Sequence, residues 1–157
     1  IINIFYLDPC VKKCAEYHCD KHVVKMILES VQMLSTVIRG SGIDAGYKAT
    51  HPKHPCTLWA GQSLSNYKWL LLLTKYLNEE YRYRYNKSVN HKSYDLALTL
   101  PTPDILDIGL TKHAQAMPDQ YKSDDPLTSY RDYYTFEKSN LHKWTKREIP
   151  VWLGLWV

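Results

Sequence analysis

The chain has 157 residues, of which 45% are hydrophobic and 13% aromatic, and its formal net charge is +4. This apolar content is enough for a folded core and excludes an intrinsically disordered chain. No signal peptide and no apolar stretch long enough to span a membrane are visible. We therefore expect a single helical domain over residues 1–157, located in the cytoplasm, or in the host-cell cytoplasm if the protein is viral.

The first half of the chain predicts two long helices. The pair Asp8-Pro9 is a favourable helix start, because aspartate caps the helix and proline suits its first turn. Apolar residues then recur at helical spacing until Gly40, which ends the helix. The predicted elements are an extended segment at 2–7, a helix at 9–39, a loop at 40–56 and a second helix at 57–85.

The second half predicts shorter helices between long loops. Asp125-Pro126 repeats the favourable helix start, and the aromatic tail at 147–157 is expected to pack back on the body. The predicted elements are a polar connector at 86–94, short helices at 94–99 and 103–115, a loop at 116–126 and a helix at 126–146. The expected fold is all-α: a compact single domain of three long helices with long loops.

One face of the first predicted helix carries titratable groups. Side chains at i, i+4 and i+7 share a helix face, so His18, His22 and Glu29 form one stripe, with Lys25 between the last two. A partly buried glutamate beside a histidine fits general acid–base chemistry. The structural alternative is an ordinary ion pair between Lys25 and Glu29, with His22 as a half-buried histidine whose hydrogen bonds are satisfied.

A metal site is a further possibility on the same helix. Four potential ligands follow at four-residue steps, namely Cys10, Cys14, His18 and His22. On one straight helix they span roughly 18 Å, so they cannot all bind one ion. A metal-dependent hydrolase would need His18 and His22 together with ligands from the loop at 40–56. Those loop candidates are His51, His54 and Cys56. The spacing matches no standard zinc signature, so no metal is assigned.

The order of three short motifs resembles a known family. "INI" (2–4), "DKH" (20–22) and Glu29, seven residues after the histidine, follow one another along the chain. In this order they resemble the pyrimidine-dimer DNA glycosylases of T-even-type phages and chlorella viruses, the endonuclease V type. "HPCTLWAGQ" (54–62) and the tyrosine- and arginine-rich stretch 76–94 are similar to the same family.

This resemblance implies an N-glycosylase for damaged pyrimidines, with possible abasic-site lyase activity and without a cofactor. In that family the α-amino group of the mature N-terminus attacks the sugar and forms a Schiff base, and this group falls at or just before Ile1. Glu29 takes the role of the catalytic glutamate, and His22 lies at the abasic site. The alternatives are a non-catalytic nucleic-acid-binding protein of the same fold and the metal-dependent hydrolase.

The distribution of charge favours DNA as the partner of a monomeric protein. Residues 44–92 carry eight Lys/Arg against three Asp/Glu, and such cations hold phosphates. A cationic helix end is also an ordinary solvated surface. The predicted DNA contacts are Lys21, Lys25, Arg39, Lys53, His54, Arg82, Arg84 and Lys87. A second cationic group is interpreted as a solvated rim around core aromatics, namely Arg131, Lys138, Lys143, Lys146 and Arg147.

Overall fold

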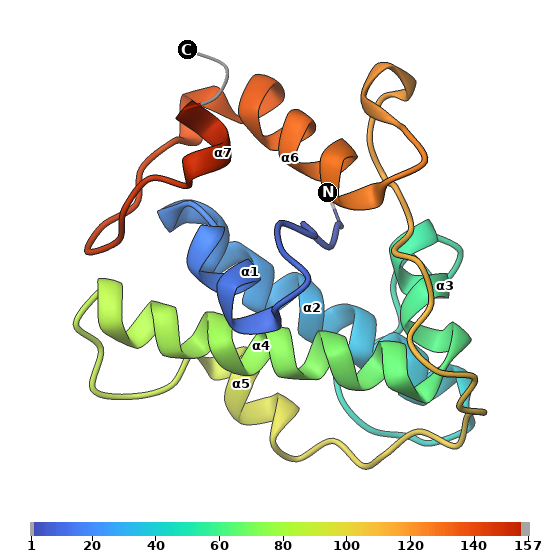
Figure 1. The fold of residues 1–157 in the computed structure, drawn as a ribbon. Helices are drawn as coiled ribbons and strands as arrows, with labels where there is room; N and C mark the ends of the chain where they lie inside the picture. Colours follow the sequence, from blue (N-terminus) through green and yellow to red (C-terminus); the bar gives the residue numbers. More distant parts are fainter. Residues whose placement is uncertain (1, 155–157) are drawn as a thin grey trace.

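Two helices of 21 residues form the centre of the fold, which a computed structural model describes for residues 2–154. They are α2 and α4, which pack along each other (Figure 1). The α-helices are α1 (Val11–Tyr17), α2 (Asp20–Gly40), α3 (Pro55–Gln62), α4 (Leu64–Arg84), α5 (Lys92–Ala97), α6 (Pro126–Glu137) and α7 (Val151–Gly154). Two 3₁₀ helices, η1 (Asp119–Tyr121) and η2 (Ser139–Leu141), flank α6.

The first predicted long helix is in fact two helices, α1 and α2. His18 and Cys19 between them have extended backbone, with ψ angles of 135° and 160°. Arg84 donates to the carbonyl oxygens of Glu16 and His18 at 2.8 and 2.6 Å, and the Cys19 N–H donates to the Tyr134 hydroxyl at 2.8 Å. Partners from α4 and α6 therefore satisfy the backbone groups that the break releases.

The second predicted long helix is also interrupted, at Ser63, between α3 and α4. Ser63 is extended and makes no side-chain cap for α4. Instead, the Leu64 N–H donates to the carbonyl oxygen of Leu106 at 2.9 Å, and the Ser63 hydroxyl donates to Asp107 at 3.0 Å. Both partners belong to the segment 98–118, which we call the strap. The strap therefore supplies hydrogen bonds that a capping side chain normally provides.

The C-terminal half differs from the sequence prediction in two places. The helix predicted at 103–115 is wrong, because these strap residues have no regular secondary structure. The helix predicted at 126–146 ends at Glu137. The short helix predicted at 94–99 exists, shifted slightly, as α5. Residues 2–154 contain helices and no strand, so the all-α class is confirmed, with two long helices rather than three.

The N-terminal segment 2–10 is extended and lies between α6 and α2 (Figure 1). The Phe5 ring is 4.5 Å from the His22 ring on α2 and 5.3 Å from the Tyr134 ring on α6. At the other end, Trp152 of α7 is buried and contacts Tyr17 and Tyr134, as expected of a tail that packs back. None of the helices within residues 2–154 has the length and apolar character that crossing a bilayer requires.

Candidate functional site

Glu29 is a buried carboxylate on α2, only 5% exposed. Its Oε2 lies 3.7 Å from Nζ of Lys25, one helical turn earlier, and the Lys25 side chain is 57% exposed. Oε1 has no hydrogen-bond partner among the described residues. The ion pair of the structural interpretation therefore exists, but it leaves one buried oxygen of Glu29 unsatisfied, which is unusual for a structural group.

Burial raises the pKa of the Glu29 carboxyl above its usual value of 4.5. Positive charges and donors oppose this rise, the Lys25 ammonium group most strongly and the backbone N–H of Asn3 less so. Desolvation is the largest of these effects, so protonation is easier than in an exposed glutamate. The influence of Asn3 also places the carboxyl beside the N-terminal segment. Glu29 is thus suited to exchange a proton close to the beginning of the chain.

Replacing Glu29 with glutamine is expected to stabilise the protein at neutral pH. Because the pKa is raised in the folded state, the contribution of Glu29 to stability is complete below pH 4.5 and is lost as the pH rises through the folded-state pKa. The variant should therefore exceed the wild type in unfolding free energy at pH 7–8, and this advantage should shrink towards pH 4. Urea denaturation across this range measures it. The exposed Glu79→Gln is the control, and an equal pH profile for both variants would contradict the prediction.

His22 is buried and lies one turn before Lys25 on the same helix. Its ring is stacked on Phe5 at 4.5 Å with an interplanar angle of 12°, and its Nδ1 lies 2.8 Å from the Tyr134 hydroxyl. Burial lowers the pKa of His22 to about 3, with smaller contributions from His18, Lys138 and Lys25. The imidazole is therefore neutral at physiological pH, and it can accept or donate a hydrogen bond but carries no charge.

Asn3 fixes the N-terminal segment beside these two side chains. Its amide nitrogen donates to the carbonyl oxygen of Ala116 at 2.9 Å, and its oxygen accepts from the Tyr130 hydroxyl at 3.0 Å. The same oxygen accepts the backbone N–H of Ile4 at 2.8 Å. The next residue towards the start is buried Ile2, and Ile1, the predicted position of the nucleophile, lies outside the described residues.

A small hollow of about 60 Å³ opens beside His22. Its lining residues are Asn3, Phe5, His22, Lys25, Met26, Tyr133 and Lys138. Lys25 and Lys138 give it a positive border, and Nζ of Lys138 lies 5.0 Å from the centre of the Tyr133 ring. The volume corresponds to roughly two water molecules, whereas small-molecule sites usually measure about 300–1,000 Å³. A ligand as large as a nucleotide would fit only after the lysine and tyrosine side chains at the rim moved.

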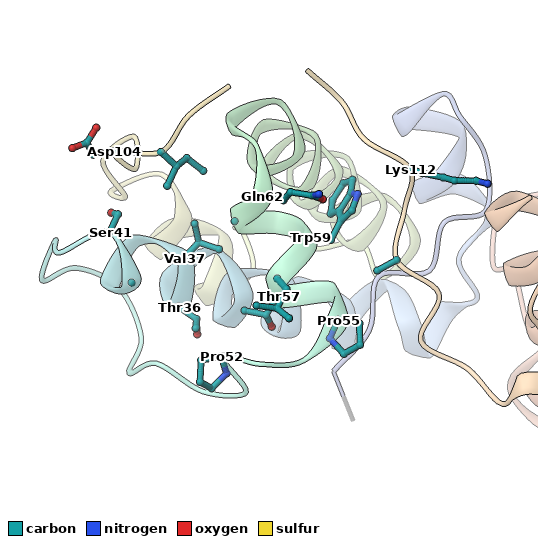
Figure 2. A pocket seen from close by; sticks show the side chains of 15 residues that line it. Thr36, Val37, Ser41, Pro52, Pro55, Thr57, Trp59, Gln62, Asp104 and Lys112 are labelled. Atoms are coloured by element: carbon teal, nitrogen blue, oxygen red, sulfur yellow. The ribbon is translucent and has the colours of Figure 1, made fainter. Parts of the chain in front are cut away.

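A much larger hollow, of about 800 Å³, lies elsewhere, between the end of α2, α3 and the strap (Figure 2). Figure 2 shows Val37 of α2, Thr57 and Pro55 of α3 and Lys112 of the strap around it. Neither Glu29 nor His22 lines it. The residues with the predicted chemistry and this larger hollow therefore lie at different places in the molecule.

Some of the predicted DNA contacts are accessible to a phosphate, whereas others are buried or already bond to groups within the protein. Arg84 is 3% exposed and cannot reach a phosphate, and Arg39 bonds to the carbonyl oxygens of Tyr47 and Gly46, which fixes the loop after α2. Arg84 is therefore structural, contrary to the sequence prediction, whereas Arg39, whose side chain is 29% exposed, stays a predicted DNA contact. His54 is half-buried and caps α3 through the Cys56 N–H. The accessible cations of the predicted set are Lys21, Lys25, Lys53, Arg82 and Lys87.

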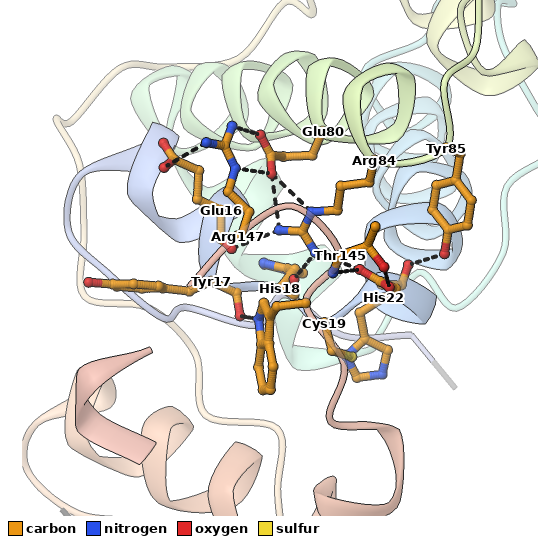
Figure 3. Close-up of polar contacts among 12 residues, drawn as sticks. Glu16, Tyr17, His18, Cys19, His22, Glu80, Arg84, Tyr85, Thr145 and Arg147 are labelled. Carbon is orange, nitrogen blue, oxygen red and sulfur yellow. Dashed lines mark hydrogen bonds and ion pairs between the residues drawn. The ribbon is translucent and has the colours of Figure 1, made fainter. Parts of the chain in front are cut away.

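Arg84 is the centre of a buried charge network (Figure 3). It forms ion pairs with Asp20 at 3.2 Å and with Glu80 at 3.0 Å, and all three side chains are at most 9% exposed. Arg147 from the C-terminal segment binds the other oxygen of Glu80 at 2.7 Å, and the Thr145 hydroxyl donates to Asp20 at 2.6 Å. The network therefore joins α2, α4 and the chain after η2 at one place.

His18 is not on the same helix as His22, although both rings lie near Phe5 and Tyr134. It lies at the C-terminal end of α1, is fully buried, and its Nδ1 is 2.7 Å from the carbonyl oxygen of Cys14. Burial lowers its pKa to about 4. Within residues 2–154 no group of three or more His, Cys, Asp or Glu side chains is placed to hold a metal ion, and all four cysteines are free thiols. The hydrolase hypothesis thus has no ligand cluster to support it.

Sequence reasoning missed two site residues that come from α6 and the residue after it. Tyr134, which the sequence analysis did not single out, contacts His22, and Lys138, which was interpreted as part of a solvated rim, borders the hollow. They lie more than 100 positions from His22, and no local pattern connects them to it. Asn3 was noted only as part of a motif, without its anchoring role.

Comparison with known proteins identifies a family. A family model described as pyrimidine dimer DNA glycosylase matches residues 2–93, which include the N-terminal segment, His22, Glu29 and helices α1–α4. No curated protein and no solved structure matches the chain. Tyr134 and Lys138 of the C-terminal part lie outside the matched range.

Proposed function

Because the chain belongs to the pyrimidine dimer DNA glycosylase family, we propose that it excises damaged pyrimidines from DNA and cleaves the resulting abasic site. One observation supports this most directly: a buried Glu29 with a raised pKa and an unpaired oxygen lies beside the N-terminal segment. The cations of Lys25 and Lys138 border the hollow beside His22, which is lined by Asn3 and Lys25 but not by Glu29 itself. A monomeric state and a cytoplasmic location stay predictions.

The proposed nucleophile is the α-amino group of the mature N-terminus, at or just before Ile1. An α-amine has a pKa of about 7.7–8.0, so much of it is neutral and nucleophilic near physiological pH. It forms a bond to the sugar C1′ while the bond from C1′ to the base breaks, and the base leaves with the electron pair. Glu29 stabilises the sugar cation and transfers protons during this exchange. The C1′–O4′ bond then breaks as the amine nitrogen forms a double bond to C1′ and O4′ takes up a proton, which gives the Schiff base. Removal of a C2′ proton from this Schiff base permits loss of the 3′-phosphate.

Borohydride trapping tests this proposal. The full chain with its natural N-terminus is incubated with a duplex containing one cyclobutane pyrimidine dimer, or with an abasic duplex, in the presence of borohydride. The expected result is a covalent protein–DNA adduct whose attachment maps to the first residue, and acetylation of the N-terminus should abolish it. Salt-sensitive binding without base release or adduct would overturn the proposal and favour the non-catalytic binder.

Lys138 is expected to contact a DNA phosphate. Its ammonium group borders the hollow beside His22, and each phosphate contact adds about 0.9 to the slope of log affinity against log salt concentration. Lys138→Gln should therefore lower the magnitude of this slope by about 1, as measured by fluorescence anisotropy at several salt concentrations. Lys75→Gln on the exposed side of α4 is the matched control. The same loss of slope in both variants would show that only general charge matters.

A further inference from the structure

Tyr134 connects α6 to His22 through a shared hydroxyl. The residue is fully buried, and its hydroxyl accepts the Cys19 backbone N–H at 2.8 Å. The hydroxyl also lies 2.8 Å from Nδ1 of His22 and donates to Sγ of Cys19 at 3.1 Å. His22 and Cys19 lie together at one end of the polar cluster in Figure 3.

The direction of the hydrogen bond from Tyr134 to Cys19 indicates which nitrogen of His22 carries the proton. A phenol has one proton to donate. The Tyr134 hydroxyl donates this proton to Sγ of Cys19. Towards Nδ1 of His22 it therefore presents a lone pair of its oxygen and acts as an acceptor. Nδ1 must then be the donor. In a neutral imidazole only one nitrogen carries hydrogen, so Nε2 is left with its lone pair free.

The free nitrogen belongs to the site. His22 lines the hollow, and among the described residues its Nε2 has no hydrogen-bond partner. The stack on Phe5 fixes the plane of the ring. We propose that Tyr134 is a positioning residue that holds His22 as its Nδ1–H tautomer, so that Nε2 faces the hollow as a hydrogen-bond acceptor for the sugar of the bound substrate. The identity of the substrate rests on the proposed function, whereas the tautomer does not.

The low pKa of His22 agrees with this arrangement. A protonated imidazole would have no acceptor to offer, and burial together with the nearby Lys25 and Lys138 lowers the pKa to about 3. The acceptor therefore persists over the physiological pH range. This feature distinguishes His22 from a histidine that serves as a proton-switch near neutrality.

Nitrogen NMR of the free protein tests the tautomer directly. Long-range nitrogen–proton correlations of chain labelled with ¹⁵N-histidine distinguish Nδ1–H from Nε2–H, and the signals that His22→Gln removes identify the residue. The expected result is Nδ1–H in the wild type. Cys19→Ala removes the acceptor of the phenol proton, so this proton should turn to Nδ1 and His22 should change to the Nε2–H tautomer. Nε2–H in the wild type, or an unchanged tautomer in Cys19→Ala, would overturn the inference.

Activity provides the second measurement. Tyr134→Phe should lower kcat for dimer excision by about 10- to 100-fold, the range typical of groups that orient a functional histidine, and leave KM nearly unchanged. Tyr67→Phe, which removes the hydroxyl of another buried tyrosine near the start of α4, should retain wild-type kcat. Equal kcat in both variants would refute the positioning role. An inactive wild type with the Nδ1–H tautomer would instead refute the proposed function and leave the tautomer assignment standing.

Discussion

Glu29→Gln is expected to reduce base release from dimer-containing DNA by about 10²- to 10⁴-fold, the usual contribution of a general acid–base group. Glutamine keeps the shape of the side chain but can neither carry a negative charge nor exchange a proton. Oε1 of Glu29 has no hydrogen-bond partner among the described residues, and the substitution also removes the ion pair between Oε2 and the exposed Lys25. Single-turnover kinetics with a duplex containing one dimer measure the effect, and borohydride trapping should show a parallel loss of adduct.

Two companion variants separate chemistry from folding in this experiment. Glu29→Asp keeps the negative charge, but the side chain is shorter by one methylene group. Its rate of base release should therefore lie between those of the wild type and Glu29→Gln. Glu79→Gln changes an exposed carboxylate on α4 and should retain full activity. Glu29→Gln should still bind damaged duplex, because the lysines at the rim remain. Wild-type rates in a folded Glu29→Gln protein would remove this carboxylate from the reaction.

Arg84→Met is expected to lower the free energy of unfolding by about 3–5 kcal/mol, the range for breaking a buried ion pair by removing one partner. The substitution leaves Asp20 buried without its guanidinium partner. It also removes the donors to the carbonyl oxygens of Glu16 and His18 at the break between α1 and α2. Urea denaturation followed by circular dichroism measures the loss.

Arg147, which binds the same carboxylate as Arg84, is the matched control for this prediction. Arg147 also binds Glu80, but its side chain is 32% exposed, and Arg84 remains to neutralise the carboxylate in its absence. Arg147→Met should therefore lower the unfolding free energy by about 1 kcal/mol or less. A loss of similar size in both variants would contradict the central position assigned to Arg84. Arg84→Lys should fall near Arg84→Met, because lysine lacks the fork of donors that reaches several acceptors.

Part of the site follows from local periodicity. His22 and Glu29 are seven residues apart, and on any continuous helix that spacing places them on one face. α2 is continuous over both residues, so the prediction holds for this pair. His18 fails the same rule, because the helix ends before Cys19 and restarts at Asp20. Periodicity is reliable only within one helix, and it does not reveal where a helix is interrupted.

For the arginines of α4, burial decides whether the side chain is structural or accessible, and charge alone does not. Arg82 and Arg84 look equivalent in the sequence, yet Arg82 is exposed and Arg84 is buried among carboxylates and carbonyl oxygens. The two positions differ by two residues, which places them on different sides of α4. Which side faces α1 and α2 depends on how the helices pack, and the basic composition of this stretch holds no information about it.

The sequence by itself determined the helical class, the shared face of His22 and Glu29, and the family, because all three depend on residues that are close together or in a fixed order. Tertiary structure alone decided where the long helices break and which groups complete the site. The breaks at His18–Cys19 and at Ser63 depend on hydrogen bonds from Arg84, Tyr134 and the strap. A backbone group released from a helix is tolerated only where such a distant partner reaches it.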